Sequence, residues 1–379
     1  MQIEAINQSY SSEIACVVLC CRVFIKSAKA EELERFVVLH EIDWNEVYKL
    51  SALQRIRPVV YHVLVNHKIP VPASNLSQFY NYCRVHSAFA FERRMESARI
   101  QQLLLQHQIP ARMYKGLDFT ITAYGGDIAM REFTDIDMIV DQQHLPALAA
   151  VMIAEGYTSK QLNYFNRFPA HFVEGRKDIC FEKRQSNGRL FCFEFHYKPT
   201  GYLVDLPLAF SDVLGPDYLS SAQPISRQQY YELMLINHGA SDYYPNLRSL
   251  IDMVLLARDE SWQIPAVLQR HEQLGNILID RLLKGSLVEG RNKCADVLAE
   301  QLLTSTALGF NKIAAMRIRF LKSPRTLLKA LHFLLLPNEE DINRTHWPYF
   351  HLYYFIKPFR LLKKHFRALV GGKAMAGGN

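Results

Sequence analysis

A run of alternating strand and helix signals between residues 109 and 157 constrains the fold more than any other feature of this sequence. Residues 111–114 predict a short strand, and the helix that follows ends at Tyr124, before two consecutive glycines. Residues 133–140, "FTDIDMIV", predict a second strand because strong β-formers surround two aspartates. Residues 145–154 predict a second helix, with a glycine just beyond its end. This order indicates an α/β unit.

A β-hairpin is predicted immediately afterwards. Residues 178–184 and 190–198 flank Ser-Asn-Gly, a strong signal for a tight turn. In the second arm, three phenylalanines alternate with polar or small residues that include Glu194 and His196. The period of two places the phenylalanines on the core face and the Glu194 and His196 side chains together on the other.

The length of the hairpin loop decides which residues of the two arms face each other. A two-residue loop sets Phe181 opposite Glu194, whereas a three-residue loop sets Phe181 opposite Phe193. We favour the three-residue loop, because it gives one apolar face and one face that carries Glu182, Glu194 and His196.

Helical patterns surround this α/β unit on both sides. We therefore expect an α+β fold, in which a small mixed-sheet core at residues 106–200 is flanked by an N-terminal helical region, 1–105, and a C-terminal helical region, 201–345. Residues 346–379 form a basic tail that is rich in aromatic side chains. Within the C-terminal region, further helices are expected at 263–285, 292–307 and 324–336.

The net positive charge of the chain comes from its C-terminal end. Lys and Arg number 44 against 37 Asp and Glu, and no acidic residue follows Asp341. A neutral body does not predict a domain that grips duplex nucleic acid across one face. The tail could bind single-stranded RNA or a peripheral anionic membrane surface. Alternatively, it packs on the body with its basic side in solvent.

The cysteine pattern and the apolar runs point to a cytoplasmic protein. Seven cysteines contain no CxxC pair, which predicts reduced thiols buried as small apolar side chains. The apolar runs are shorter than the roughly 18–20 residues that a membrane-spanning helix needs, so we expect no transmembrane segment. The 49% apolar content is ample for real cores.

Asp135 and Asp137 are the strongest candidates for a chemical role. Alternate residues of a strand project from the same face, so their carboxylates are expected side by side. Two acids this close repel each other unless a proton or a cation separates them. Mg²⁺ is commonly held by one or two carboxylates together with substrate phosphates. Because short Asp-x-Asp segments also arise by chance, the context of the pair decides its meaning.

Two neighbouring features favour phosphate binding. Lys115-Gly116 lies where the first strand ends, and a glycine there lets a phosphate approach backbone N–H groups at the start of a helix. Arg131 lies four residues before Asp135 and can form two parallel hydrogen bonds to a phosphate. An ordinary salt bridge to Asp135 is the alternative for this arginine.

Residues 113–157, "MYKGLDFTITAYGGDIAMREFTDIDMIVDQQHLPALAAVMIAEGY", resemble the centre of the uncharacterised bacterial nucleotidyltransferase family. The likeness continues in "FCFEFHYKP" and "LMLINHGASDYYPNLRSLIDMVLLARD", and in "LLLPNEEDI" and "YFIKPFRLLKKH" near the C-terminus. The family belongs to the nucleotidyltransferase superfamily, which implies a polymerase-beta-like fold. The chain departs from the family in "REFTD", where many members have proline or glycine after the arginine. That difference concerns loop geometry and leaves the expected ligands in place.

The resemblance implies a metal-dependent enzyme that moves an NMP from an NTP to a hydroxyl acceptor and releases pyrophosphate. Asp135, Asp137 and Glu194 are then the ligands of Mg²⁺ (or Mn²⁺), and Glu194 also helps to deprotonate the acceptor. The nucleotide-binding residues that the resemblance implies are Lys115, Gly116 and Arg131.

Four further polar residues are candidates for contacting the acceptor or for supporting the site. Arg248 and Asp252 lie four residues apart on one helix face, where a structural ion pair is the alternative. His238 precedes a glycine at an expected helix end, where a capping role is the alternative. His196 could orient Glu194.

Two classes of function remain open from the sequence. The first is a nucleotidyltransferase whose acceptor is a small molecule, a peptide, a sugar or an RNA end. The second is a catalytically lapsed nucleotide-binding or accessory protein of the same fold, in a biosynthetic or toxin–antitoxin system. The presence of all three carboxylates favours the enzyme.

Overall fold

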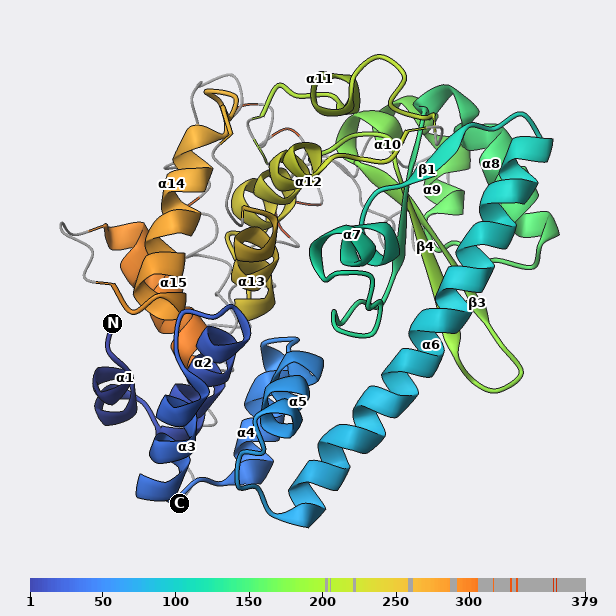
Figure 1. Cartoon of the computed structure of the whole chain (residues 1–379). Coiled ribbons are helices and arrows are strands. Elements are labelled where there is room, and N and C mark those ends of the chain that lie inside the picture. The colour runs from blue at the N-terminus through green and yellow to red at the C-terminus, as the bar shows by residue number, and fades with distance from the viewer. Residues whose placement is uncertain are drawn as a thin grey trace.

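A computed structural model describes residues 1–201, 204, 206–220, 223–257, 262–286 and 292–305, together with positions 316, 328, 332, 357 and 359 (Figure 1). The expected helix at 324–336 and the basic tail at 346–379 therefore lie outside the described residues, apart from four isolated positions. Within the described ranges, no helix is both long and apolar enough to cross a membrane.

A four-stranded mixed sheet lies beside a larger group of helices, which confirms the expected α+β class (Figure 1). The strand order is β1-β2-β4-β3. β1 pairs antiparallel with β2, β2 parallel with β4, and β3 antiparallel with β4. The strands are β1 (Ala111–Met113), β2 (Ile136–Val140), β3 (Asp178–Arg184) and β4 (Leu190–His196).

The register of the β3–β4 hairpin is the one that the three-residue loop predicts. Phe181 lies opposite Phe193. The loop is closed by the Gln185 N–H, which donates to the Arg189 carbonyl over 2.8 Å. Gly188 has φ +81°, the left-handed conformation that such a loop requires.

The two faces of the sheet differ in character. Ile136, Phe193 and their neighbours on one face join a buried apolar cluster. Asp137, Glu194 and His196 project from the opposite face, because side chains alternate along both strands. The period of two in the sequence therefore predicts correctly which face of the sheet is buried and which face is polar.

The second strand begins at Ile136, so the expectation of a strand from residue 133 is wrong at its start. The backbone just before β2 is hydrogen-bonded to arginine side chains instead of a neighbouring strand. Arg93 Nη1 donates to the Phe133 carbonyl over 2.7 Å, and Arg248 donates to the Glu132 carbonyl. Asp135 consequently lies at a bend one residue before the strand.

Helices cover the apolar face of the sheet. The 34-residue helix α6 (Ala73–Gln106) runs from the N-terminal helices to the sheet, where Ile100 and Leu104 join the apolar cluster (Figure 1). The cluster is completed from α8 (Leu145–Ala154), α9 (Leu162–Arg167) and α10 (Pro169–Gly175). A short 3₁₀ helix, η1 (Gln142–His144), precedes α8, whose bounds are those expected from the sequence.

The N- and C-terminal helices share a second, larger apolar cluster. Polar contacts also join them: Gln54 accepts from the Leu247 N–H over 2.7 Å and donates to the Leu302 carbonyl over 2.8 Å. The division of the chain into domains at residues 106, 201 and 346 stays a prediction. The N-terminal helices are α1 (Ile3–Ser9), α2 (Ser12–Phe24), α3 (Ala30–Leu39), α4 (Trp44–Leu53) and α5 (Arg57–Asn66).

Two of the C-terminal helices expected from the sequence are present, and both are shorter than expected. The expected helix at 263–285 is an α-helix, α14 (Gln269–Leu278), that continues into a π-helical segment, η3 (Ile279–Leu283). The expected helix at 292–307 is α15 (Lys293–Thr304). The others are α11 (Phe210–Leu214), α12 (Arg227–Met234), the π-helical segment η2 (Leu235–Ser241) and α13 (Leu247–Leu256).

The cysteines divide into two groups. Four are buried among apolar side chains, as expected, but Cys83, Cys180 and Cys192 are only half-buried. For these three the expectation of a core position is wrong. The last two belong to the hairpin, whose polar face is open enough to leave them accessible.

Candidate functional site

Two carboxylates lie side by side where β2 and β4 run parallel. Asp137 is the register partner of Glu194, so their side chains leave the same face of adjacent strands. His196 follows two residues later on β4 and projects from that face too. One side-chain ligand atom from each of Asp137, Glu194 and His196 lies within 4.8 Å of the others. The parallel register of β2 and β4 thus places Asp137 beside Glu194, which is 57 positions later in the sequence, and near His196.

His196 holds this cluster together. Its Nε2 lies 2.9 Å from Asp137 Oδ1 and 3.4 Å from Glu194 Oε2. Its ring is fully buried and packs edge-on against Tyr114, with 5.2 Å between the ring centroids. On the far side, His196 Nδ1 lies 3.6 Å from Asp178 Oδ2. An imidazole fixed in this way can orient both Asp137 and Glu194.

The two carboxylates differ in exposure. The Asp137 side chain is 7% exposed and that of Glu194 is 32% exposed. Burial alone raises the pKa of Asp137, but Lys115 and then His196 outweigh it and hold that pKa well below its usual range. The hydrogen bond from His196 lowers the pKa of Glu194, against a smaller rise from burial. Both groups are therefore ionised at neutral pH, and Glu194 is the more accessible of the two.

Asp135 adds a third carboxyl group at the entrance to β2. Burial raises its pKa, and the negative charges of Asp137 and Glu194 raise it further, against a lowering by Lys115. Its charge is thus poorly compensated by the surrounding protein. A cation beside these three groups would relieve that repulsion.

Lys115 and Gly116 connect β1 to α7 (Gly116–Ala123) beside the carboxylates. Lys115 Nζ lies 3.4 Å from Asp137 Oδ1. Gly116 has φ +54°, and a Cβ there would lie 3.5 Å from the Asp135 carbonyl oxygen. Glycine is therefore needed at this turn for its left-handed backbone conformation, while the approach to the Asp135 backbone is an ordinary contact distance.

Arg131 lies in a second, buried cluster centred on Asp252. Its Nη2 lies 2.9 Å from Asp252 Oδ2, and its Nε lies 3.1 and 3.0 Å from the two carboxylate oxygens. His238 Nε2 lies 3.0 Å from the same Oδ2, and the Tyr124 hydroxyl donates to Oδ1 over 2.7 Å. The guanidinium of Arg131 is thus occupied by Asp252 in this conformation. A contact of Arg131 with phosphate stays a prediction.

This second cluster fixes the loop before β2 to the C-terminal helices. Arg248, on α13, donates to the carbonyl of Glu132, the residue after Arg131. Burial, followed by the charge of Arg131, lowers the pKa of Arg248 to about 10. His238 lies in the last turn of the π-helical segment η2, near a helix end as the sequence suggested, and its ring contacts the Asp252 carboxylate. The geometry assigns these residues a structural part in positioning Asp135 and Asp137, and an acceptor contact for them stays untested.

Two buried residues near the carboxylates were not singled out in the sequence. Arg93, on α6, donates to the Phe133 carbonyl, and the charge of Asp135 raises the pKa of Arg93 against a larger lowering by burial. The Tyr114 hydroxyl is buried and has no hydrogen-bond partner among the described residues. Tyr114 could have been suspected because it directly precedes Lys115. Arg93 carries no such signal, because its place depends on how α6 crosses the sheet.

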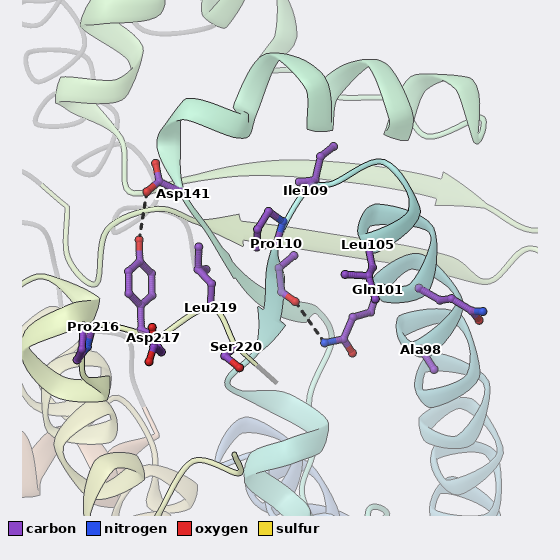
Figure 2. A pocket seen from close by; sticks show the side chains of 13 residues that line it. Ala98, Gln101, Leu105, Ile109, Pro110, Asp141, Pro216, Asp217, Leu219 and Ser220 are labelled. Carbon is purple, nitrogen blue, oxygen red and sulfur yellow. Dashed lines mark hydrogen bonds between the residues drawn. The ribbon is translucent and has the colours of Figure 1, made fainter. Parts of the chain in front are cut away.

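A pocket of about 770 Å³ is lined by residues other than Asp135, Asp137 and Glu194 (Figure 2). It is lined by the end of α6, by the start of β1 and by residues 216–220. Asp141, which follows β2, hydrogen-bonds the Tyr218 hydroxyl across it over 3.5 Å. Asp141 is four residues beyond Asp137, about 13 Å along an extended strand. The pocket is therefore near the opposite end of β2 from Asp135.

Comparison with known proteins gives one family. The sequence model of a family described as uncharacterised nucleotidyltransferase matches residues 40–277, more than half of the chain. The match extends from α4 to α14 and includes both polar clusters. No curated protein and no solved structure matches the chain.

Proposed function

This chain belongs to the uncharacterised nucleotidyltransferase family, and we propose that it moves an NMP group from an NTP to a hydroxyl acceptor with release of pyrophosphate. The observation that carries the proposal is that Asp137 and Glu194 are register partners on one face of the sheet, beside the turn at Lys115-Gly116, and that their charges act on the carboxyl group of Asp135 just before β2. Carboxylates and a glycine turn are the parts that phosphoryl transfer needs, because its catalysis rests on positioning and on charge stabilisation.

The three carboxylates fit a divalent cation such as Mg²⁺ or Mn²⁺. All are oxygen donors, which hard cations prefer, and the raised pKa of Asp135 points to negative charge that the protein leaves partly uncompensated. We propose that Asp135, Asp137 and Glu194 hold the cation. When bound, such a cation neutralises charge on the triphosphate.

The remaining roles follow from exposure and reach. Glu194 is ionised and partly exposed, so it is suited to accept the proton of an acceptor hydroxyl. His196 orients Glu194 and Asp137 through its Nε2. Lys115, whose ammonium already reaches Asp137, can contact a phosphate that is held beside these carboxylates. Gly116 allows a phosphate to approach the start of α7.

One observation favours the alternative, a catalytically lapsed nucleotide-binding or accessory protein. Asp137 Oδ1 already has two cationic or donor partners, Lys115 Nζ and His196 Nε2. A carboxylate satisfied in this way by its own protein has less need of a metal ion. Activity measurements separate the two readings.

The decisive experiment is label transfer. The purified chain is incubated with each α-³²P-labelled NTP in turn, with Mg²⁺ and with total cell extract as the source of acceptor. We expect label on one class of product: small molecule, peptide, sugar or RNA. That transfer should be lost in Asp137→Asn and retained in Asp242→Asn, which removes an exposed carboxylate outside the site.

Two results would contradict the proposal of an active enzyme. The first is NTP binding by the purified chain without transfer of label under any of these conditions, which supports the lapsed protein. The second is transfer that persists at the wild-type rate in Asp137→Asn, because the reaction then does not depend on this site.

A further inference from the structure

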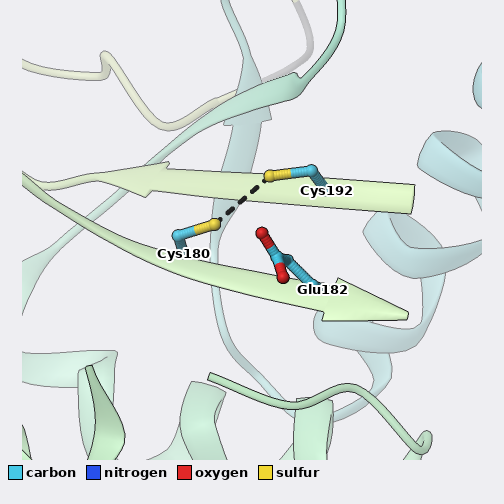
Figure 3. A group of neighbouring side chains, drawn as sticks. All are labelled: Cys180, Glu182 and Cys192. Carbon is cyan, nitrogen blue, oxygen red and sulfur yellow. Dashed lines mark hydrogen bonds between the residues drawn. The ribbon is translucent and has the colours of Figure 1, made fainter. Parts of the chain in front are cut away.

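A second group of potential metal ligands lies on the same face of the sheet. It consists of Cys180 and Glu182 on β3 and Cys192 on β4, all of them half-buried. The two Sγ atoms are 3.2 Å apart, and a carboxylate oxygen of Glu182 lies within 4.8 Å of both. Figure 3 shows the two thiols and the carboxylate turned toward one another. The expected carboxylate site does not use any of these three groups.

The strand register argues against a disulfide as the purpose of this cysteine pair. Cys180 lies opposite Glu194 and Cys192 lies opposite Glu182, so the two cysteines are diagonal neighbours. Diagonal neighbours in an antiparallel pair have Cα atoms about 7–8 Å apart. A disulfide requires a Cα separation of about 4.4–6.8 Å, so this bond would need the strands to shift.

The same spacing suits a metal ion that bridges the thiols. With Zn–S bonds of about 2.3 Å, two thiolates on a tetrahedral ion lie about 3.8 Å apart. The observed Sγ–Sγ distance of 3.2 Å reaches that value by small side-chain rotations on a fixed backbone. A Glu182 oxygen can complete a set of three ligands, because its present distance of at most 4.8 Å leaves a similar adjustment.

The backbone that carries these ligands is held firmly. Glu182 exchanges two backbone hydrogen bonds with Thr158, of 2.8 and 2.9 Å, on the outer edge of β3. The Cys180 N–H donates to Gln161 Oε1 over 2.7 Å. Ligands on strands that are fixed in this way are preorganised, which lowers the cost of ordering them around an ion.

We propose that Cys180, Cys192 and Glu182 form a binding site for a thiophilic divalent cation of the zinc class, with an open fourth position for water. Thiolates select such ions over Mg²⁺, which prefers oxygen ligands. Cys192 is two residues from Glu194 on β4, and Cys180 faces Glu194 across the hairpin. A zinc-class ion would therefore be bound directly beside the carboxylates, in a separate site with different ligand chemistry.

Cadmium titration of the reduced, full-length protein tests the proposal directly, because Cd²⁺ bound to thiolate absorbs in the ultraviolet. We expect the thiolate band to saturate at one Cd²⁺ per chain in the presence of millimolar Mg²⁺. Zn²⁺ should displace the Cd²⁺ and abolish the band. Cys180→Ser and Cys192→Ser should each weaken Cd²⁺ binding by about 100-fold or more, because losing a metal ligand costs more affinity than losing a hydrogen bond that supports a ligand.

Cys83→Ser is the matched control, since Cys83 is another half-buried cysteine but lies on α6. It should keep the wild-type affinity and stoichiometry. Glu182→Gln should weaken binding while leaving the thiolate band visible at higher Cd²⁺ concentration. Circular dichroism of the metal-free variants identifies any that fail to fold, and Glu182→Gln, which changes a single atom, then carries the test.

Three results would overturn the proposal. One is an absent thiolate band in the reduced wild-type protein. Another is a band that persists unchanged in both Cys180→Ser and Cys192→Ser. The last is full competition by Mg²⁺, which would assign the binding to the neighbouring carboxylates.

Discussion

Removing the negative charge of Asp252 should destabilise the protein more than most other single substitutions. The Asp252 side chain is 0% exposed, and it is the carboxylate that pairs with the buried guanidinium of Arg131. Asp252→Asn keeps the shape of the side chain and one oxygen for hydrogen bonding, but it leaves Arg131 as a buried charge without its counter-ion. Breaking a buried pair by removing one partner costs about 3–5 kcal/mol in the free energy of unfolding.

Urea denaturation followed by tryptophan fluorescence measures this loss. Asp296→Asn is the control, because Asp296 pairs with Arg281 at the surface and is 48% exposed. Exposed pairs contribute about 0–1 kcal/mol. A loss below about 1 kcal/mol in Asp252→Asn, equal to that of the control, would refute the view that this cluster fixes the loop before β2 to the C-terminal helices.

The same residue predicts a pH dependence. Burial raises the pKa of Asp252, but Arg131 and then His238 outweigh it and hold the folded-state pKa well below the usual range. A depressed pKa contributes stability above the unfolded value of about 3.9, and that contribution is lost as the pH falls toward the folded value. The stability of the wild type should therefore fall more steeply than that of Asp252→Asn below about pH 4. Parallel curves would contradict the charge argument.

Three further predictions concern the carboxylate site. Mg²⁺ or Mn²⁺ at 100 times its dissociation constant should raise the free energy of unfolding by about 2.7 kcal/mol, which is seen as a higher melting temperature. Asp137→Asn should abolish that rise. A rise that persists in this variant would place the cation elsewhere. Glu194→Gln should retain most metal–NTP binding in calorimetry but lose turnover, and wild-type turnover would exclude it as the base. Gly116→Ala should lower the free energy of unfolding, measured by urea denaturation, by about 1–2 kcal/mol, because the φ of Gly116 is positive. Gly201→Ala should lower it far less, since there is open space around Gly201. Equal losses would contradict the strain argument.

The sequence by itself determined the local elements and the faces of the sheet. Alternation of phenylalanine with polar residues fixed which side of β4 is buried. The Ser-Asn-Gly signal left two loop lengths open, and the need for one apolar face selected the register that sets Phe181 opposite Phe193. The helix bounds of α8 followed from its apolar run and from the glycine after it. These features are readable because they depend on the period of the strand and on turn chemistry, both of which act over a few residues.

Only the tertiary structure decided how the charged groups pair. Arg131 is four residues from Asp135 in sequence, yet its partner is Asp252, 121 residues away, because α13 packs against the loop before β2. The same packing prevents the strand pairing of β2 from extending back to Asp135. Cys180 and Cys192 also had no spacing that marked them, and the twist and register of the hairpin bring their sulfur atoms together. Buried charges and thiols pair with whatever the packed elements bring within reach, so their partners depend on contacts that no local pattern encodes.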